Sequence, residues 1–350
     1  MKWRVGFFLL LSFLFACHSK YDNSNLSIFK YNESNGISTL DPAFSNDKAT
    51  IWATSQIFSP LVKMNDNLVV TPLVSRKWEI SEDGRKYIFT LRRDVFFHDH
   101  SVFKNGKGRS VVASDFVYSF NRLLSEDLAS SGSWVFNNVE DYYAENDSVL
   151  VINLKNPFPP FLSLLSMQYC SVVPYELAGR PEFRSHPIGT GPFKFQFWKE
   201  GVKLVLRKNE NYFEKENGEK LPKLDAVAIT FIKDKQSEFL SFLQGEIDFI
   251  SGIDPSYKDE ILNQDGTLRD KYSEEINLQS IPFLNTEYLA FLMDGNTVLS
   301  RNKDLRKAIN YAIDKKKMLK FLRNNIGVSA ESGFVPKGMS SFSDSVEGYS

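Results

Sequence analysis

The sequence has few cysteines and histidines, and it lacks the motifs that accompany most metal sites. Its 350 residues contain two cysteines, Cys17 and Cys170, and four histidines. The neighbours of Cys170 are apolar, which favours a buried, inert thiol, and no disulfide framework is predicted. No Cys-x-x-Cys or His-Glu-x-x-His motif accompanies the close pair His98 and His100. We therefore predict neither a metal site nor any other cofactor.

Signatures of catalysis and of nucleotide binding are also missing. No Gly-x-Ser-x-Gly elbow occurs, which favours a protein that is not an enzyme. A secreted hydrolase stays open as an alternative, because the spacing of a catalytic triad in sequence is not fixed. The stretch HPIGTGPFKFQFWKEG at 186–201 has no Gly-Lys-Ser/Thr ending, and Pro192 lacks a backbone N–H. It predicts a turn and then a hairpin strand with Phe193, Phe195 and Phe197 on one face.

The chain has almost no net charge and no long apolar run after its first residues. Its formal net charge is −1, so the concentrated basic surface typical of nucleic-acid-binding proteins is not expected. A length of 350 residues exceeds one ordinary compact core and predicts two or more lobes.

The N-terminus reads as an export signal. Lys2 and Arg4 precede the apolar run Gly6–Ala16, which is short for a transmembrane helix. The run ends at Cys17, as in the lipobox of bacterial lipoproteins, so we predict a signal peptide at 1–16, lipidation of Cys17 and a tether at 17–25. An ordinary signal peptide with a chance cysteine is the alternative.

Hydrophobic periodicity predicts interleaved strands and helices. An Asp-Gly turn at Asp83-Gly84 joins predicted strands Trp78–Ile80 and Tyr87–Leu91. Ser114 and Asp304 are the predicted N-caps of two amphipathic helices. The remaining predicted elements are strands at 148–154 and 247–250 and helices at 161–165 and 237–244. This order favours an α/β fold with mixed sheets.

Eight blocks in chain order resemble the extracytoplasmic solute-binding proteins of peptide-type and nickel-type ABC importers, solute-binding protein family 5. The blocks are Ile57–Val62, Pro72–Ile80 with Asp83-Gly84, Phe89–Arg93 with Val95 and Phe97–Asp99, Ser114–Phe120, Ile188–Phe193, Arg207–Phe213, Gly245–Asp248 and Leu305–Asp314. The chain departs from the family at His100, where glycine is usual. It also ends earlier than family members do, so a fragment is expected.

The resemblance implies a two-lobe clamp of the periplasmic-binding-protein type II kind, with an extra subdomain in the first lobe. The implied boundaries are 26–48 and 166–278 for lobe I, 49–165 for the extra subdomain and 279–350 for an incomplete lobe II. Ligand would be trapped between the lobes by hinge closure.

The resemblance also implies three ligand-contact zones. These are Ser45, Asn46 and Asp47 after the Leu40-Asp41-Pro42 turn; Ile250, Ser251 and Gly252 after the Gly245–Asp248 strand; and Tyr288, Leu289 and Ala290 in a strand that begins lobe II. Peptide binders of this kind hold backbone groups, which every peptide offers.

The implied function is capture of short peptides and their delivery to an ABC permease and its ATPase subunit. The expected protein is a monomeric bacterial lipoprotein in the periplasmic space or at the cell surface, anchored to the membrane by lipid. A nickel chelate or an oligosaccharide as ligand, and a surface lipoprotein without a transport role, are the alternatives.

Overall fold

The structure, a computed structural model, describes residues 26–281 and 283–348, so the predicted signal peptide and Cys17 lie outside the described residues. The chain forms two compact units. Unit 1 contains the described residues up to Lys233 together with Gln244–Phe249, and unit 2 contains Asp234–Leu243 and the residues from Ile250 onward. The predicted lobe and subdomain boundaries stay predictions.

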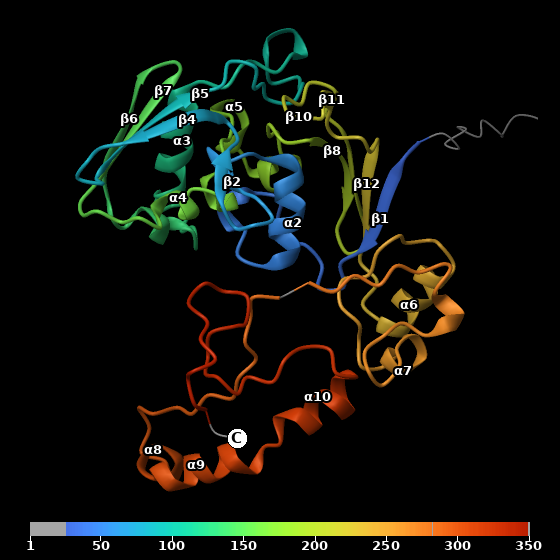
Figure 1. The fold of residues 1–350 in the computed structure, drawn as a ribbon. Helices are drawn as coiled ribbons and strands as arrows, with labels where there is room; N and C mark the ends of the chain where they lie inside the picture. The colour runs from blue at the N-terminus through green and yellow to red at the C-terminus, as the bar shows by residue number, and fades with distance from the viewer. Residues whose placement is uncertain (1–25, 282, 349–350) are drawn as a thin grey trace, which may run out of the picture. The chain divides into compact units, whose positions relative to one another are not determined.

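One four-stranded sheet of unit 1 brings together the first described strand and strands that follow it by more than 150 residues. Its order is β1-β12-β9-β8, where β1 spans Ile28–Asn32, β8 Phe193–Lys199, β9 Lys203–Lys208 and β12 Ala226–Thr230. The strand β1 lies parallel to β12, and the other neighbours are antiparallel (Figure 1). The first four residues of β12 are all buried, as expected of an apolar strand in the interior of a sheet.

The predicted hairpin in the stretch 186–201 is confirmed, but the predicted face is wrong. Strands β8 and β9 pair, with a register shift between Phe195 and Phe197. This irregularity puts Phe193 in the core and leaves the side chain of Phe197 48% exposed. Side chains of a regular strand alternate between the two faces of the sheet. The bulge before Phe197 shifts this alternation by one residue, so Phe197 does not share the buried face of Phe193.

The second four-stranded sheet of unit 1 has the order β4-β5-β7-β6, and all its neighbours are antiparallel. Its strands are β4 Ser75–Ile80, β5 Lys86–Leu91, β6 Val139–Asn146 and β7 Val149–Leu154. The predicted Asp-Gly turn does join β4 to β5, with Gly84 at φ 70°. Tyr87, Phe89 and Leu91 enter the core, as their common face predicts.

Helix α3, Ala113–Leu123, packs against β6 and β7 and buries Phe116, Phe120 and Leu123. The predicted cap is wrong, because the helix begins after Val112. The carboxylate of Asp115 accepts the Val112 N–H at 2.9 Å, so Asp115 acts from the first turn and Ser114 already lies inside the helix.

The remaining elements of unit 1 are short, except for helix α2 at Lys48–Ile57. They are β2 Val62–Met64, β3 Val70–Pro72, β10 Lys215–Glu216, β11 Glu219–Lys220, α4 Phe161–Leu164, α5 Tyr175–Ala178 and the 3₁₀ turns η2 Pro42–Phe44, η3 Lys104–Gly106, η4 Ser133–Phe136, η5 Gln168–Cys170 and η6 Pro181–Arg184. One continuous hydrophobic core runs from Tyr31 to Phe231 through both four-stranded sheets.

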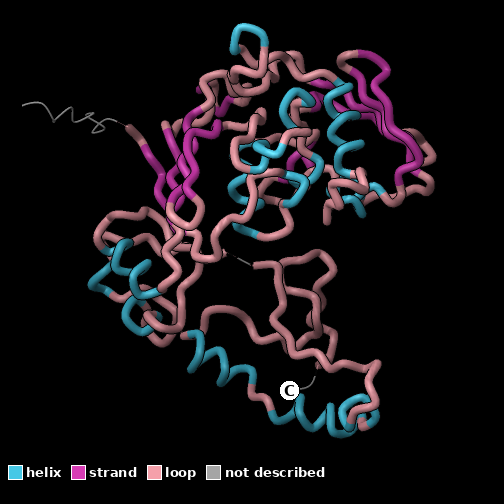
Figure 2. The backbone as a smooth tube through the Cα atoms, turned by 180° about the vertical axis from the view of Figure 1, so that it is seen from behind, coloured by secondary structure: helices cyan, strands magenta, loops and turns pink. Residues whose placement is uncertain are grey.

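Unit 2 is built from helices and long loops (Figure 2). Its helices are α6 Lys235–Leu243, α7 Lys258–Ile261, α8 Val298–Arg301, α9 Lys303–Ala312 and α10 Lys315–Arg323, with the turn η7 at Asp270–Tyr272. Its small core centres on Phe239, Tyr257, Ile261 and Leu262. The helix predicted at 237–244 is therefore confirmed as α6.

Three local predictions in the C-terminal part are wrong. The predicted strand at 247–250 is reduced to one isolated bridge between Tyr31 and Phe249. The predicted strand that contains Tyr288, Leu289 and Ala290 is not formed among the described residues 283–293. Helix α9 is capped by Asn302, whose side chain accepts the Leu305 N–H at 2.9 Å, instead of by Asp304.

No helix within the described ranges is long and apolar enough to cross a membrane.

Candidate functional site

The first predicted contact zone is a loop that unit 1 holds rigidly. The carboxylate of Asp41 accepts the Ala43 N–H at 3.0 Å and pairs with the guanidinium of Arg122, and the Ser130 hydroxyl donates to the Ala43 carbonyl. These bonds fix η2, the turn that leads into Ser45, Asn46 and Asp47.

Within this zone, two side chains serve the loop itself. The Ser45 hydroxyl is buried and lies 2.9 Å from that of Thr54. Asp47 caps α2 by accepting the N–H and the hydroxyl of Thr50 at 2.9 and 2.8 Å. Asn46 is exposed, and its side-chain amide makes no hydrogen bond to another described side chain or backbone group. Asn46 is therefore the residue of this zone whose side chain is best placed to meet a ligand.

The second and third predicted zones lie in unit 2. Ile250 packs against the small core of this unit, and the Gly252 carbonyl accepts from the Tyr257 hydroxyl at 3.4 Å. Gly252 has φ 81°, a conformation that favours glycine. Tyr288 and Leu289 are 67% and 69% exposed, Ala290 is also exposed, and the Tyr288 ring packs edge-on against Phe334 at 4.7 Å. Assembly of the three zones into one site stays a prediction.

A row of aromatic rings beside the first zone was missed by the sequence analysis. The rings of Trp52, Tyr31, Phe29 and Phe249 follow one another with centroid separations of 6.3, 6.0 and 6.1 Å. The Lys48 ammonium lies 4.8 Å from the centroid of the Trp52 ring. Burial and then the charge of Glu33 raise the pKa of Tyr31, so its hydroxyl stays neutral.

The place of Phe249 in the aromatic row depends on contacts between two distant segments. The Lys30 N–H donates to the Asp248 carboxylate and the Asp248 N–H donates to the Lys30 carbonyl, both at 2.7 Å. This pair holds Phe249 beside Phe29. The signal available in the sequence was the same-face pair Phe29 and Tyr31 in a short strand, but nothing local pointed to Trp52 or Phe249.

The glycine stretch is a structural junction. His98 is 4% exposed; its backbone N–H donates to the Gly189 carbonyl at 2.8 Å, and its Nδ1 accepts the Gly189 N–H at 3.3 Å. This bond leaves Nε2 as the donor to the Gly191 carbonyl at 3.0 Å. The Asn209 amide donates to the same carbonyl at 2.9 Å. Four of the blocks noted in the sequence therefore meet here, since Gly191 N–H also donates to the Ile57 carbonyl at 2.8 Å.

Glycine is required at this junction by the close approach of helix α2. A β-carbon at Gly189 would lie 2.0 Å from the Ile57 carbonyl oxygen, and one at Gly191 would lie 2.6 Å from that of Gln56. Burial lowers the pKa of His98 from 6.5 to about 4, although the hydrogen bond to Gly191 acts in the opposite direction.

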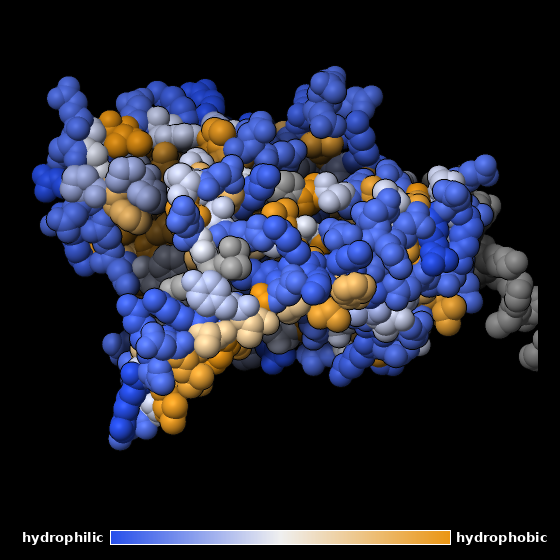
Figure 3. All heavy atoms as spheres, turned by 60° about the horizontal axis from the view of Figure 1, so that its bottom comes forward, coloured by the Kyte–Doolittle hydropathy of each residue, from blue (hydrophilic) through white to orange (hydrophobic). Residues whose placement is uncertain are grey.

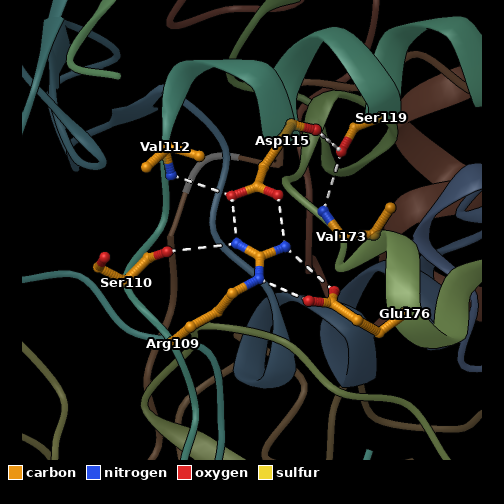
Figure 4. Close-up of polar contacts among 7 residues, drawn as sticks. All are labelled: Arg109, Ser110, Val112, Asp115, Ser119, Val173 and Glu176. Carbon is orange, nitrogen blue, oxygen red and sulfur yellow. Dashed lines mark hydrogen bonds and ion pairs between the residues drawn. The ribbon is translucent and has the colours of Figure 1, made fainter. Parts of the chain in front are cut away.

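A charged cluster around Arg109 is also structural. Figure 4 shows the Arg109 guanidinium between the carboxylates of Asp115 and Glu176, with hydrogen bonds of 2.6 to 3.0 Å to both and a longer one to the Ser110 carbonyl. Burial alone would lower the pKa of Arg109, but these two carboxylates raise it above its ordinary value. All the guanidinium nitrogens have acceptors, so the cluster joins α3 to α5 and leaves no donor for a ligand.

Among the described residues, no group of three or more His, Cys, Asp or Glu side chains could hold a metal ion. Cys170 is buried, and burial raises the pKa of its thiol, which disfavours the reactive thiolate. The arrangement in unit 1 is suited to non-covalent contact through Asn46 and the aromatic row.

Comparison with known proteins identifies the family. Residues 69–350 match the sequence profile of the family described as bacterial extracellular solute-binding proteins, family 5 Middle. The chain belongs to this family. The dipeptide-binding protein of Escherichia coli is 28% identical over 298 residues, which are 80% of this chain and 52% of the relative. The nickel-binding periplasmic protein of the same organism is 29% identical over 279 residues, 77% of this chain and 48% of the relative.

Solved structures show the same fold for this family 5 chain. A periplasmic binding protein from Helicobacter pylori, DppA in complex with the peptide STSA, aligns with a TM-score of 0.75 at 23% identity, covering 92% of this chain and 63% of that one. NikZ from Campylobacter jejuni in complex with Ni(L-His) aligns with a TM-score of 0.67 at 26% identity, covering 86% and 55%. The predicted α/β fold of periplasmic binding proteins is confirmed.

The family 5 chain spans about half the length of the curated relatives it matches. Those relatives are binding proteins for dipeptides, oligopeptides, nickel and heme.

Proposed function

We propose that this family 5 protein is the substrate-binding component of an ABC importer and that it captures short peptides between two lobes. The observation that carries the proposal is family membership over most of the chain, with relatives that bind dipeptides and oligopeptides. Release to a membrane permease driven by an ATPase subunit completes the proposed function. No covalent step is involved, so the protein is a binder and not an enzyme.

Asn46 and the aromatic row of unit 1 form the proposed first wall of the peptide site. Asn46 offers an amide that can both donate to and accept from a peptide backbone. The exposed edge at Phe249 and the half-buried Trp52 offer apolar surface for peptide side chains. Ser45 and Asp47 are proposed to act by holding the loop, and the contact roles of Ile250–Gly252 and Tyr288–Ala290 rest on the resemblance.

Calorimetric titration of the purified protein with a pool of di- to pentapeptides tests the ligand class. We expect saturable binding to peptides and none to oligosaccharides. Asn46→Ala should weaken peptide binding by roughly 5-fold, the loss of about 1 kcal/mol for one hydrogen bond. Asn67→Ala, in the turn between β2 and β3, is the control and should bind as the unaltered protein does.

A nickel chelate is the second candidate ligand, favoured by the 29% identical nickel-binding relative and by the structural match to NikZ with Ni(L-His). Titration with nickel and free histidine in the absence of peptide separates the two. Binding of this chelate with no response to any peptide would overturn the peptide proposal.

We also propose that Cys17 carries a lipid after cleavage of residues 1–16 and that the protein resides in the periplasmic space or at the cell surface. The support is the apolar run that ends at this cysteine. Metabolic labelling with a fatty-acid analogue should mark the protein and fail to mark Cys17→Ala. Equal labelling of the two would disprove lipidation at this residue. Loss of peptide uptake on deletion of the gene would separate a transport role from that of a surface lipoprotein.

A further inference from the structure

Unit 1 contains an open pocket that none of the features above uses. Its volume is about 490 Å³, and its lining residues are His100, Ser101, Val102, Leu177, Arg180, Glu182 and His186. They come from the loop after Phe97, from α5 and the residue pair after it, and from η6 and the turn that follows. Two imidazoles and one guanidinium therefore gather at one hollow, with a single carboxylate among them.

In each imidazole of the pocket, one ring nitrogen is engaged within the protein and the other is available to a ligand. The Nδ1 of His100 accepts the Val102 N–H at 3.2 Å, and the Nδ1 of His186 lies 2.9 Å from the Ser185 hydroxyl. The His186 ring is held edge-on against Phe195 at 5.0 Å. The Nε2 atoms make no hydrogen bond to other residues in the two described ranges, so they can act as donors.

The net charge of the pocket depends on pH. Its charged and titratable groups are His100, Arg180, Glu182 and His186. The nearest approach of Arg180 to Glu182 is 3.9 Å, and both side chains are about half exposed, so the pair offsets its own charge without closing into a tight bridge. With neutral imidazoles the lining carries no net charge, and each protonated histidine adds one positive charge.

We propose that this pocket binds a small free inorganic oxyanion, of the sulfate or phosphate class, and that binding tightens as His100 becomes protonated. An oxyanion accepts hydrogen bonds from both imidazoles and from Arg180, which can present two parallel donors to it. Burial, Arg180 and His186 together lower the pKa of His100, so a bound anion should shift this pKa back upward. The proposal is independent of the peptide site.

Proton NMR titration of the histidine ring signals tests the proposal, with sulfate as the probe because it stays doubly charged throughout the range. His100→Gln and His186→Gln assign the signals. In 20 mM sulfate, the pKa of His100 should rise by about 0.5 unit relative to chloride at equal ionic strength, which corresponds to roughly 3-fold tighter sulfate binding when His100 is protonated. The signal of buried His98 should not respond to sulfate.

Two arginines of equal exposure provide the matched variants. Arg180 and Arg184 both have side chains that are 57% exposed, but Arg184 donates to the Ser38 carbonyl and pairs with Glu200 outside the pocket. Arg180→Gln should abolish the sulfate effect, and Arg184→Gln should retain it. Glu182→Gln should strengthen it, because one negative charge is removed. The proposal is overturned if sulfate leaves the pKa of His100 unchanged, or shifts it as much in Arg180→Gln as in the unaltered protein.

Discussion

The two units of the chain differ in how they use their apolar residues. Unit 1 buries them in one continuous core that spans both sheets. Helices α8, α9 and α10 of unit 2 contain no buried residue, and large apolar side chains such as Val298 and Phe321 are mostly exposed. Patches of apolar side chains are visible among hydrophilic ones in Figure 3.

The contrast shows that an amphipathic pattern predicts a helix but not its burial. The stripe Leu305, Ala308, Ile309, Ala312 and Ile313 has the helical period, and α9 does form. Burial of such a stripe needs a partner surface from elsewhere in the chain, as α3 has in β6 and β7. Unit 2 instead uses polar contacts, including Asn324, which bonds to Lys258 and Asp259.

The stability of unit 1 can be followed separately, because tryptophan fluorescence reports on this unit. The described tryptophans Trp52, Trp78, Trp134 and Trp198 all lie in unit 1, so tryptophan fluorescence follows the unfolding of that unit.

Phe120→Ala should have the largest effect. Phe120 is fully buried and its ring lies 4.6 Å from that of Phe136 and 5.5 Å from that of Tyr142. We expect unit 1 to lose about 4 kcal/mol of stability in urea unfolding followed by fluorescence, the usual cost of such a truncation. A loss below about 1 kcal/mol would mean that the core of unit 1 is not packed as described.

Gly189→Ala should cost unit 1 about 3 kcal/mol, because the new methyl group meets backbone atoms of α2 that cannot move alone. Gly295→Ala in unit 2 is the matched control. Its β-carbon would meet side-chain methyl groups alone, that of Thr297 at 3.3 Å and one of Leu292 at 3.9 Å. The control should change stability by less than about 0.5 kcal/mol, measured by far-ultraviolet circular dichroism. An equal loss of stability in Gly189→Ala and Gly295→Ala would show that the glycine junction of unit 1 is no more tightly packed than the loop of unit 2.

Acid should weaken unit 1 through His98. The folded-state pKa of about 4 lies below the ordinary value of 6.5, so the unfolded chain binds the proton more readily. The contribution is fully present above pH 6.5 and falls as the pH drops toward 4, with a loss of about 2 kcal/mol between pH 7 and pH 5. His98→Gln should flatten the dependence of stability on pH, measured by urea unfolding in chloride buffer. His186→Gln should leave the dependence in place.

Ile309→Ala should have the smallest effect, at most about 1 kcal/mol, because this side chain is only partly buried. Circular dichroism of α-helical content during urea unfolding is the measurement. A loss as large as that of Phe120→Ala would show that the stripe of α9 is buried in solution and would break the contrast between the units.

Local chemistry made part of the fold predictable. The β4–β5 hairpin follows from an Asp-Gly turn between alternating strands, and α6 and α9 follow from their apolar period. The two predicted N-caps were wrong because several neighbouring polar residues could each cap the first turn. Asp115 and Asn302 do so in the structure, and the sequence does not show which φ/ψ state each residue adopts. The bulge near Phe197 is likewise set by pairing with β9.

The candidate site was less predictable because its parts come from distant segments. The resemblance pointed to Asn46, and the structure leaves its side chain exposed. Trp52 and Phe249 join Phe29 and Tyr31 only after α2 and the Asp248 contact are in place. The bonds between His98 and the glycine stretch span more than 90 residues, a separation over which no local pattern carries information.

The parallel pairing of β1 with β12 also sets the order in which unit 1 can fold. Ile28 lies opposite Ala226 and Asn32 opposite Thr230, so the first strand has no partner until about 200 further residues have been synthesised. Contacts so far apart must close a long loop before they contribute free energy, which slows folding. During synthesis β1 therefore emerges from the ribosome before its partner strand exists. It is among the last strands of the sheet to form its hydrogen bonds.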